Sequence, residues 1–290
     1  MKIALIGTSP IIFLIAHKIS KKNQVTIFDY GKNYGGAWSW EKYYGKYIPT
    51  KTNVIVPANS MEEKSLKGII SYFKKNFKIK PKIIKHSYHT LHSYKPKKVY
   101  DFKLHELYKK IFKKKKIKIV KKKIQKIKFE NKVVINNKFK FDKIFIPYFA
   151  GVREFCINKK KVKINFKMIT SKHLLIISTR KLFNTFYYSE NFNSFLDRAQ
   201  LLKKKNHFIF KARIRKKFKS YKKNDLINLL FKKEEDKKKI KLSKIIKYKN
   251  FFRDQDQIKE LEKVNLKRNA KIIDTSQFVA SFLKNKTLIV

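Results

Sequence analysis

The chain has 290 residues, 43% of them hydrophobic, which excludes a disordered tail and allows one large domain or two small ones. Its single cysteine excludes an intramolecular disulfide and a thiolate metal cluster, as expected of a cytoplasmic protein, and no apolar run approaches the roughly 18 residues of a membrane-spanning helix. The net charge of +54 comes almost entirely from lysines spread through every predicted element alongside abundant Ile, Asn, Phe and Tyr, a composition typical of an A/T-biased genome.

Residues 1–39 are predicted to form a strand, a tight turn, a helix and a second strand. The first apolar strand, at 3–6, leads into the turn Gly7-Thr8-Ser9-Pro10, an apolar helix follows, and the second strand, at 25–28, ends in Asp29. The spacing from the turn to Asp29 is close to the roughly 20 residues that separate a phosphate-binding turn from a ribose-binding acid in dinucleotide-binding folds. We therefore predict a nucleotide-binding βαβ unit.

A second glycine turn follows Asp29. Five of the seven glycines lie at or before Gly45, and two of them are adjacent, Gly35 and Gly36. In a chain so poor in glycine, those that remain indicate a sharp turn of the backbone or its close approach to a ligand.

Residues 46–100 are predicted to contain a short strand at 54–56, a helix at 62–77 and an extended segment at 78–100. The extended segment carries three histidines at intervals of three, His86, His89 and His92. An extended chain would turn these side chains to alternate faces, and no cysteine or carboxylate is interleaved with them, so we predict no metal site.

Residues 101–151 alternate between clear helix and strand patterns. A helix at 101–113 is followed by a strand at 117–120, and a β-meander is predicted at 124–129, 133–135 and 139–141. An apolar strand at 143–147 then ends in a small-residue turn at Ala150 and Gly151. A buried strand with such an ending is typical of a Rossmann sheet beside its cofactor.

Residues 152–290 are less regular. Strands are predicted at 160–168, 174–178 and 207–214, and helices at 224–231 and 256–264. The lysine runs at 203–205, 216–217 and 237–239 are predicted to be solvated turns or helix faces.

Taken together, these features resemble the FAD-dependent oxidoreductases with a Rossmann-type FAD/NAD(P)-binding domain. The string GGAWSWEKYYG at 35–45 is similar in spacing to the GG-x-W-x-W-x-x-Y-x-G stretch of flavin-dependent monooxygenases, and the meander resembles the amine oxidase and UDP-galactopyranose mutase branch. The resemblance covers roughly the first half of the chain. It implies an α/β fold, with an interleaved mixed α+β substrate domain beside the cofactor domain and its β-meander. The implied cofactor domain is 1–45 and 101–151, and the implied substrate or cap region is 46–100 and 152–290.

The resemblance also implies a set of cofactor-binding residues. In this chain they are Gly7, Thr8, Ser9, Pro10, Asp29, Gly35, Gly36, Trp38, Ala150 and Gly151. Gly7 would make the tight turn before a helix whose N-terminus faces the FAD pyrophosphate, and Asp29 would bind the adenosine ribose. Trp38 and its neighbour Trp40 would line the flavin or the substrate channel, or simply pack as core aromatics.

The phosphate turn departs from the usual G-x-G-x-x-G pattern at two positions. Ser9 and Ile12 stand where the second and third glycines allow close approach to the pyrophosphate and close packing of helix on strand. The chain also lacks a second glycine-rich turn for NADPH and a late glycine and acid pair. We therefore expect a minimal, divergent or inactive relative of the family.

The sequence identifies no catalytic acid, base or nucleophile. Candidates lie in segments that face the flavin in such folds, namely His86, His89, Tyr94, Arg180, Tyr187, Tyr188 and Arg198. Arg198 would bind an anionic substrate group, although an ion pair with Asp197 or Glu190 is the simpler expectation. Cys156 follows the Ala150-Gly151 turn and is more simply explained as a small packed residue.

Two alternatives remain open at the sequence level. One is a basic protein that uses a Rossmann scaffold to bind nucleic acid or an anionic membrane surface, supported by the +54 charge but not by any recognisable binding module. The other is a Rossmann protein that binds NAD through the same Gly7 turn and Asp29. The favoured prediction is FAD and a small-molecule substrate.

Overall fold

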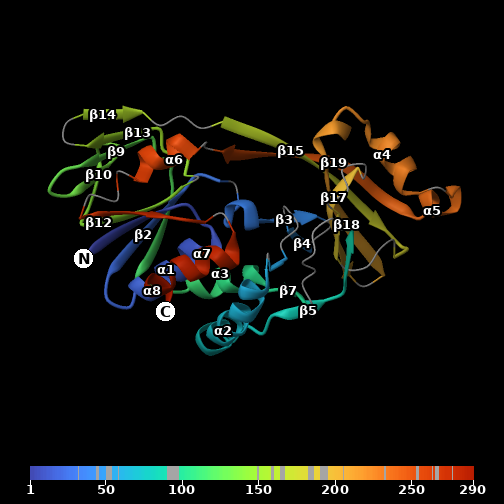
Figure 1. Cartoon of the computed structure of the whole chain (residues 1–290), viewed down its shortest axis with the longest axis horizontal. Coiled ribbons are helices and arrows are strands. Elements are labelled where there is room, and N and C mark those ends of the chain that lie inside the picture. The colour runs from blue at the N-terminus through green and yellow to red at the C-terminus, as the bar shows by residue number, and fades with distance from the viewer. Residues whose placement is uncertain are drawn as a thin grey trace.

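The computed structural model describes residues 1–290 except 32, 44–45, 50–53, 58, 90–97, 149, 158–159, 164–166, 182–185, 190–194, 205, 232, 253–254, 263, 265–267 and 276. The chain forms a mixed α/β structure in which a parallel sheet and a larger, mainly antiparallel sheet lie at opposite ends of the long axis (Figure 1). None of the helices in the described residues combines the length and hydrophobicity that a membrane crossing requires.

The parallel sheet contains the predicted βαβ unit. Its strands are, in order, β20 (Ala270–Ile273), β12 (Lys143–Pro147), β1 (Lys2–Ile6), β2 (Gln24–Asp29) and β8 (Ile117–Lys121). Each neighbouring pair is parallel, and β1 and β12 are nearly continuous buried apolar runs, as expected of strands covered on both faces. The strand order reverses between β1 and β12, so the carboxyl ends of these two strands form the edge where open α/β sheets bind ligands. The predicted strands of this sheet are confirmed. The fifth strand, β20, was not predicted. It lies far beyond residues 1–45 and 101–151, which were predicted to form the cofactor domain.

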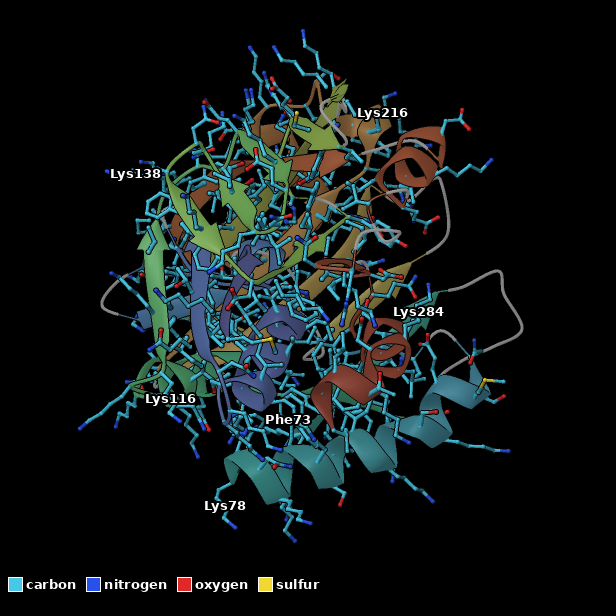
Figure 2. The ribbon with its side chains drawn as sticks, turned by 90° about the vertical axis from the view of Figure 1, so that its left-hand side faces the viewer. Phe73, Lys78, Lys116, Lys138, Lys216 and Lys284 are labelled. Atoms are coloured by element: carbon cyan, nitrogen blue, oxygen red, sulfur yellow. The ribbon has the colours of Figure 1, made fainter. Side chains whose placement is uncertain are left out.

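Helix α1 (Pro10–Ile19) is buried on all sides, which explains its apolar sequence. It contacts three other helices, namely α3 (Leu104–Phe112), α7 (Phe278–Lys284) and α8 (Lys286–Ile289). Helix α2 (Ser60–Phe77) packs against α7 and contributes Phe73, which lies in the interior, whereas labelled lysines of several elements project outward (Figure 2). The charge is therefore spread over several faces, in agreement with its even spread along the sequence.

The predicted meander is confirmed and belongs to a second sheet. This sheet contains, in order, β11 (Phe139–Phe141), β10 (Val133–Ile135), β9 (Lys126–Phe129), β13 (Glu154–Ile157) and β14 (Lys160–Lys163). Asn136 and Asn137 have positive φ in the turn between β10 and β11, a left-handed conformation that asparagine adopts more readily than most residues. Phe139 and Phe141 pack edge-on against Phe28 of β2, which joins the meander to the parallel sheet.

The third sheet is mainly antiparallel. It contains, in order, β19 (Ile240–Phe252), β15 (Lys167–Ser178), β18 (His207–Ile214), β17 (Leu196–Lys204), β16 (Phe186–Ser189) and β6 (His86–His89). Helix α4 (Lys223–Leu230) packs on one of its faces through Leu226, and α5 (Glu234–Lys238) lies on the same side (Figure 1). The predicted strands at 174–178 and 207–214 are confirmed, whereas the predicted strand at 160–168 corresponds to the separate strands β14 and β15.

The remaining elements are short. They are two hairpin-like pairs, β3 (Trp40–Tyr43) with β4 (Lys46–Pro49) and β5 (Lys82–Ile84) with β7 (Val99–Asp101), helix α6 (Gln255–Glu262), and 3-10 turns at Gly36–Trp38 and Lys216–Phe218. The strand predicted at 54–56 is reduced to one bridge between Ile55 and Tyr100. The predicted helices at 62–77, 101–113, 224–231 and 256–264 correspond to α2, α3, α4 and α6.

Candidate functional site

The turn after β1 lies at the reversal point of the parallel sheet. The Gly7 N–H donates to the Phe28 carbonyl at 2.7 Å, which ties the turn to β2. A Cβ on Gly7 would lie 3.9 Å from Pro147 Cγ at the end of β12. The turn therefore lies between the carboxyl ends of β2 and β12, where the predicted phosphate turn should be.

The buried hydroxyl of Thr8 connects the first glycine turn with both the acid and the second glycine turn. Thr8 Oγ1 donates to Asp29 Oδ2 at 2.8 Å and accepts the Gly35 N–H at 2.8 Å. Asp29 Oδ1 accepts the Gly31 N–H at 3.1 Å. The family resemblance implies that these segments bind one cofactor, and these hydrogen bonds hold the segments together.

The two adjacent glycines, Gly35 and Gly36, have different surroundings. A Cβ on Gly35, which has φ +104°, would lie 2.9 Å from the Ser39 nitrogen and 2.9 Å from the Tyr108 hydroxyl. The hydroxyl of Tyr108 is buried and has no hydrogen-bond partner among the described residues, and burial raises its pKa well above the usual value. Gly36, at φ +55°, has no atom within 4 Å of an added Cβ. Gly35 is thus required by packing, while Gly36 borders open space.

The small-residue turn after β12 closes against the end of β2. The Ala150 N–H donates to the Pro147 carbonyl at 3.0 Å, and a Cβ on Gly151 would lie 3.1 Å from the Tyr30 hydroxyl. Tyr30 directly follows Asp29. Contacts in the structure therefore link every predicted segment of the site: the Gly7 turn, Asp29, the Gly35 turn and the Ala150-Gly151 turn.

The first turn of α1 is capped by its own sequence. Ser9 is the N-cap, and its Oγ accepts the Ile12 N–H at 3.4 Å. Pro10 has no N–H to offer, although its ring suits the first helical position. The turn thus presents fewer free N–H groups than a glycine turn. Ile12, the second departure from the glycine pattern, is accommodated as a fully buried core residue.

A lysine beside Asp29 gives this edge a positive charge. Lys121 Nζ at the end of β8 lies 3.8 Å from Asp29 Oδ2 and donates to the Gly31 carbonyl at 2.5 Å. The same ammonium lies 3.8 Å from the centroid of the Tyr34 ring. Lys121 was not predicted from sequence, because nothing local distinguishes it from other lysines at strand ends.

A second acid at the same edge was also missed. Asp274 directly follows β20, accepts a hydrogen bond from Lys284 Nζ at 2.8 Å and lies 3.5 Å from the donating Ser281 hydroxyl. In the sequence it is an acid at the end of an apolar run. It was missed because no glycine lies beside it to indicate a ligand-binding turn. Asp29 and Asp274 therefore lie at the carboxyl ends of strands on either side of the reversal point.

The two tryptophans pack against elements of the parallel-sheet half. The Trp38 ring lies 5.9 Å from that of Phe278 on α7, and the Trp40 ring lies 4.7 Å from that of His105 on α3. The buried Nε1 of Trp40 has no hydrogen-bond partner among the described residues. Aromatic packing accounts for both positions.

The other candidate residues are scattered. Arg180 pairs with Asp236 of α5, and Arg198 pairs with Asp197 at 3.7 Å, the ion pair expected from sequence. The backbones of four others lie on β6 or β16, and the structure does not describe their side chains. They are His86, His89, Tyr187 and Tyr188. His92 and Tyr94 lie outside the described residues. Cys156 is half-buried on β13.

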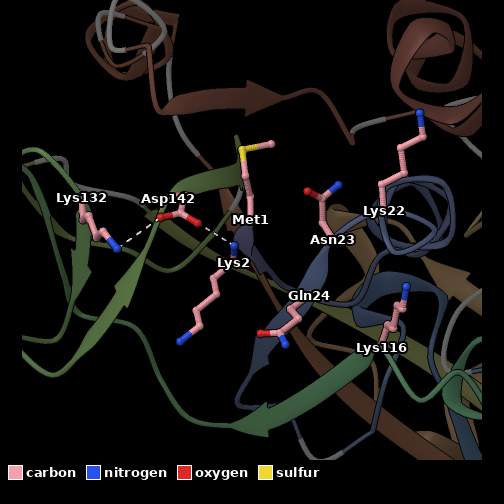
Figure 3. A pocket seen from close by; sticks show the side chains of 8 residues that line it. All are labelled: Met1, Lys2, Lys22, Asn23, Gln24, Lys116, Lys132 and Asp142. Carbon is pink, nitrogen blue, oxygen red and sulfur yellow. Dashed lines mark hydrogen bonds and ion pairs between the residues drawn. The ribbon is translucent and has the colours of Figure 1, made fainter.

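A hollow of about 470 Å³ lies at the opposite end of the parallel sheet (Figure 3). Exposed lysines surround it, and Asp142, which accepts the Lys2 N–H at 2.7 Å and pairs with Lys132 at 3.5 Å, lies at its edge. This is the amino end of the strands, remote from the Gly7 turn. Solvated lysines in so basic a chain do not make a binding site, so the hollow carries no function here.

No protein-family model and no curated protein matches the sequence. The structure is similar to solved structures over nearly the whole length of both chains. These include a proposed protoporphyrinogen oxidase from Exiguobacterium sp. 255-15 (TM-score 0.61, 7% identity, 99% of this chain and 97% of that chain) and an oxidoreductase from Methanosarcina mazei (TM-score 0.59, 10% identity, 96% and 95%). A CLA-producing fatty acid isomerase from P. acnes is also similar (TM-score 0.58, 9% identity, 99% and 98%). At such identities the likeness shows the fold alone. The chain shares the fold of these solved structures, which include an oxidoreductase.

Proposed function

We propose that this protein binds FAD at the carboxyl edge of its parallel sheet and acts as an FAD-dependent oxidoreductase on a small molecule. One observation carries the proposal: the Gly7 turn, Asp29, the second glycine turn and the Ala150-Gly151 turn are joined by direct contacts where the strand order reverses. A dinucleotide needs an acid for its ribose and close backbone approach for its diphosphate, and both requirements are met there.

The residues present fit such a cofactor in three respects. Asp29 accepts hydrogen bonds from Thr8 and Gly31, which leaves part of the roughly four acceptor positions of a carboxylate for ribose hydroxyls. Gly36 borders open space where a side chain would intrude on a ligand. The Lys121 ammonium adds positive charge to the same edge. Bound FAD would supply the redox chemistry, while these side chains bind and orient its adenosine half.

We expect the protein to bind FAD weakly because of the first turn of α1. Ser9 occupies the Ile12 N–H, and Pro10 lacks one, so a diphosphate meets fewer donors than in a glycine turn. Replacing Ser9 with glycine would release the Ile12 N–H at a cost of only a few tenths of a kcal/mol in helix capping. Ser9→Gly should therefore raise FAD affinity. The chain is on this view a divergent relative, with a functional but weakened phosphate turn.

We further propose that residues 46–100 and most of 152–290 form an interleaved substrate domain. The support is that the third sheet lies across from the carboxyl edge of the parallel sheet, with α4 and α5 on its far side (Figure 1). A substrate held on its near face would be next to the proposed cofactor site.

The test is whether the purified protein carries flavin, and whether Asp29 holds it. We expect a low flavin absorbance that rises when FAD is added, with FAD rather than NAD released on denaturation. Asp29→Ala should lower the affinity for added FAD by roughly tenfold, the loss of about one good charge-assisted hydrogen bond. Asp142→Ala is the matched control, since this carboxylate lies at the opposite end of the same sheet.

Equal FAD affinity in wild type and Asp29→Ala would refute the ribose assignment. A protein that neither carries nor binds FAD would refute the function itself. Release of NAD alone would favour a nicotinamide-dependent Rossmann protein.

A further inference from the structure

Three consecutive lysines follow one another at the carboxyl end of β8, beside the end of β2. Lys121 pairs with Asp29 across the two strands, and the Lys122 N–H donates to the Asp29 carbonyl at 2.9 Å. Lys123 comes next, and all three residues are exposed, so a ligand can reach them from solvent. The lysines therefore lie directly beside the acid to which the ribose is assigned.

Each of the three ammonium groups lies near a different aromatic ring. The distances from Nζ to the ring centroid are 3.8 Å for Lys121 and Tyr34, 5.4 Å for Lys122 and Phe139, and 6.0 Å for Lys123 and Tyr30. The electron-rich face of a ring attracts a cation, which favours these positions over the many others open to a solvated lysine side chain. The three positive charges are therefore gathered at this edge.

The three rings belong to the surroundings of Asp29. Tyr30 follows the acid directly, and Tyr34 comes just before the second glycine pair. Phe139 of the meander packs edge-on against Phe28, the residue that precedes Asp29. A lysine run that is merely solvated needs neither an acid nor aromatic rings beside it, so composition alone does not account for this arrangement.

The positive charge at this edge exceeds what Asp29 requires. One carboxylate is opposed by three ammonium groups, so three positive charges and one negative charge leave an excess of two positive charges. A phosphate monoester carries a charge of about −1.5 to −2 at pH 7, whereas the ribose hydroxyls of FAD carry none. The lysines therefore match a phosphate on the ribose better than they match a hydroxyl.

We propose that this edge also binds, in competition with FAD, an adenine dinucleotide that carries a phosphate on the 2′-oxygen of its adenosine ribose, as NADP does. In dinucleotide-binding folds an acid at the end of the second strand binds the 2′-hydroxyl, and a cation nearby accommodates a 2′-phosphate. Here Asp29 binds the remaining ribose hydroxyl and Lys121 binds the phosphate. The inference rests on the proposed function, because both ligands use the same ribose position.

Lys121 has both the donors and the exposure that a phosphate contact needs. Its ammonium donates to the Gly31 carbonyl at 2.5 Å and lies 3.8 Å from Asp29 Oδ2. Because an ammonium has three donor hydrogens, one remains for a phosphate oxygen. The Lys121 side chain is 41% exposed, so a ligand reaches it without displacing other residues. Lys122 and Lys123 add charge beside it.

The experiment compares NADP⁺ with NAD⁺ by calorimetry at low salt, because these two probes differ only in the 2′-phosphate. We expect wild type to bind NADP⁺ at least about tenfold more tightly than NAD⁺. Raising the salt concentration should reduce this preference, since exposed charges are screened. Lys121→Met should remove most of the preference, and Lys123→Met a smaller part of it. Lys118→Met is the matched control, because this exposed lysine of β8 pairs with Thr26 instead of Asp29, and it should keep the full preference.

FAD is titrated into the same preparations with and without NADP⁺. We expect NADP⁺ to lower the apparent affinity for FAD in wild type, and to lower it much less in Lys121→Met. Equal affinity for NADP⁺ and NAD⁺, no binding of either, a Lys121→Met variant that keeps the preference, or FAD binding that NADP⁺ leaves unchanged would overturn the proposal. If NADP⁺ is preferred as expected but FAD does not bind, the proposed FAD-dependent function fails and the ribose phosphate site stands.

Discussion

Two regions of the molecule hold their polar groups in different ways. At the carboxyl edge of the parallel sheet, Thr8 and Asp29 accept hydrogen bonds from backbone N–H groups of glycine turns, and Thr8 donates to Asp29. On the face of the third sheet that carries Leu175, Ile177 and Ile209, here called the inner face, Lys211 donates a hydrogen bond to Tyr248 from a neighbouring region of regular strands. In the first region the polar side chains maintain the backbone conformation, whereas in the second the backbone is fixed by strand pairing. Substitutions should therefore destabilise the first region much more than the second.

The largest effect is expected at Gly35. Gly35→Ala places a side chain at φ +104° and within 2.9 Å of the Ser39 backbone nitrogen, so the turn must move. We expect a loss of about 3 to 4 kcal/mol in the free energy of unfolding, measured by urea denaturation. Gly36→Ala is the matched control, at φ +55° in open space, and should cost about 1 kcal/mol. Equal losses at the two positions would mean that packing against Tyr108 does not set the turn.

The architecture around these glycines could be predicted from sequence because its signals are local. β1, the Gly7 turn, α1 and β2 follow one another with the expected periods, and the meander has clear turns. β20 and Asp274 could not be predicted in the same way. Their place in the parallel sheet depends on pairing with β12, more than 120 residues earlier in the numbering, and no glycine accompanies the acid.

The next largest effect is a pH dependence caused by His17 on α1. Burial, and then Lys114 and Lys21, lower the pKa of His17 from 6.5 to about 4. Between these values the unfolded chain binds a proton that the folded chain does not, so stability falls as the pH drops from about 6.5 toward 4. The loss should reach up to about 3 kcal/mol.

Urea denaturation of wild type and His17→Leu across this pH range isolates the contribution of His17. The variant should lose much less stability on acidification. Asp142 and Glu154, whose pKa values are lowered by hydrogen bonds from the Lys2 N–H and the Lys126 ammonium, also weaken the fold in acid. They are present in both proteins and cancel in the comparison. Parallel pH profiles would show that His17 is protonated in the folded state.

An intermediate effect is expected at Thr8. Thr8→Val keeps the shape of the side chain but leaves the Gly35 N–H without its acceptor and removes one of the donors to Asp29. A buried donor without a partner costs roughly 2 kcal/mol, to be measured by urea denaturation. Thr8→Ser retains the hydroxyl and should lose less. If Thr8→Val is as stable as wild type, the polar side chains do not maintain this edge, and the contrast between the regions fails.

The inner face could not be predicted from sequence for two physical reasons. Its strands have polar residues at buried positions, such as Gln200 on β17 and Lys211 on β18, so the alternation of apolar and polar residues is broken. A register shift between Ile177 and Ser178 breaks the period again where β15 pairs with β19. The residues that meet around Tyr248 come from three strands, and only the pairing of those strands brings them together.

The smallest effect on stability is expected at Lys211, and it decides the comparison. In Lys211→Met an apolar side chain of similar length replaces a buried ammonium, and the strand pairing that holds the backbone is untouched. Such replacements of buried charge are often neutral or stabilising, so the free energy of unfolding should change by less than about 1 kcal/mol. A loss above about 2 kcal/mol would mean that the Lys211 to Tyr248 hydrogen bond stabilises the sheet itself. The inner face would then resemble the Thr8 edge, where polar groups serve the fold. A neutral result alongside a large loss in Thr8→Val would show that strand pairing holds the inner face, whereas polar side chains hold the carboxyl edge of the parallel sheet.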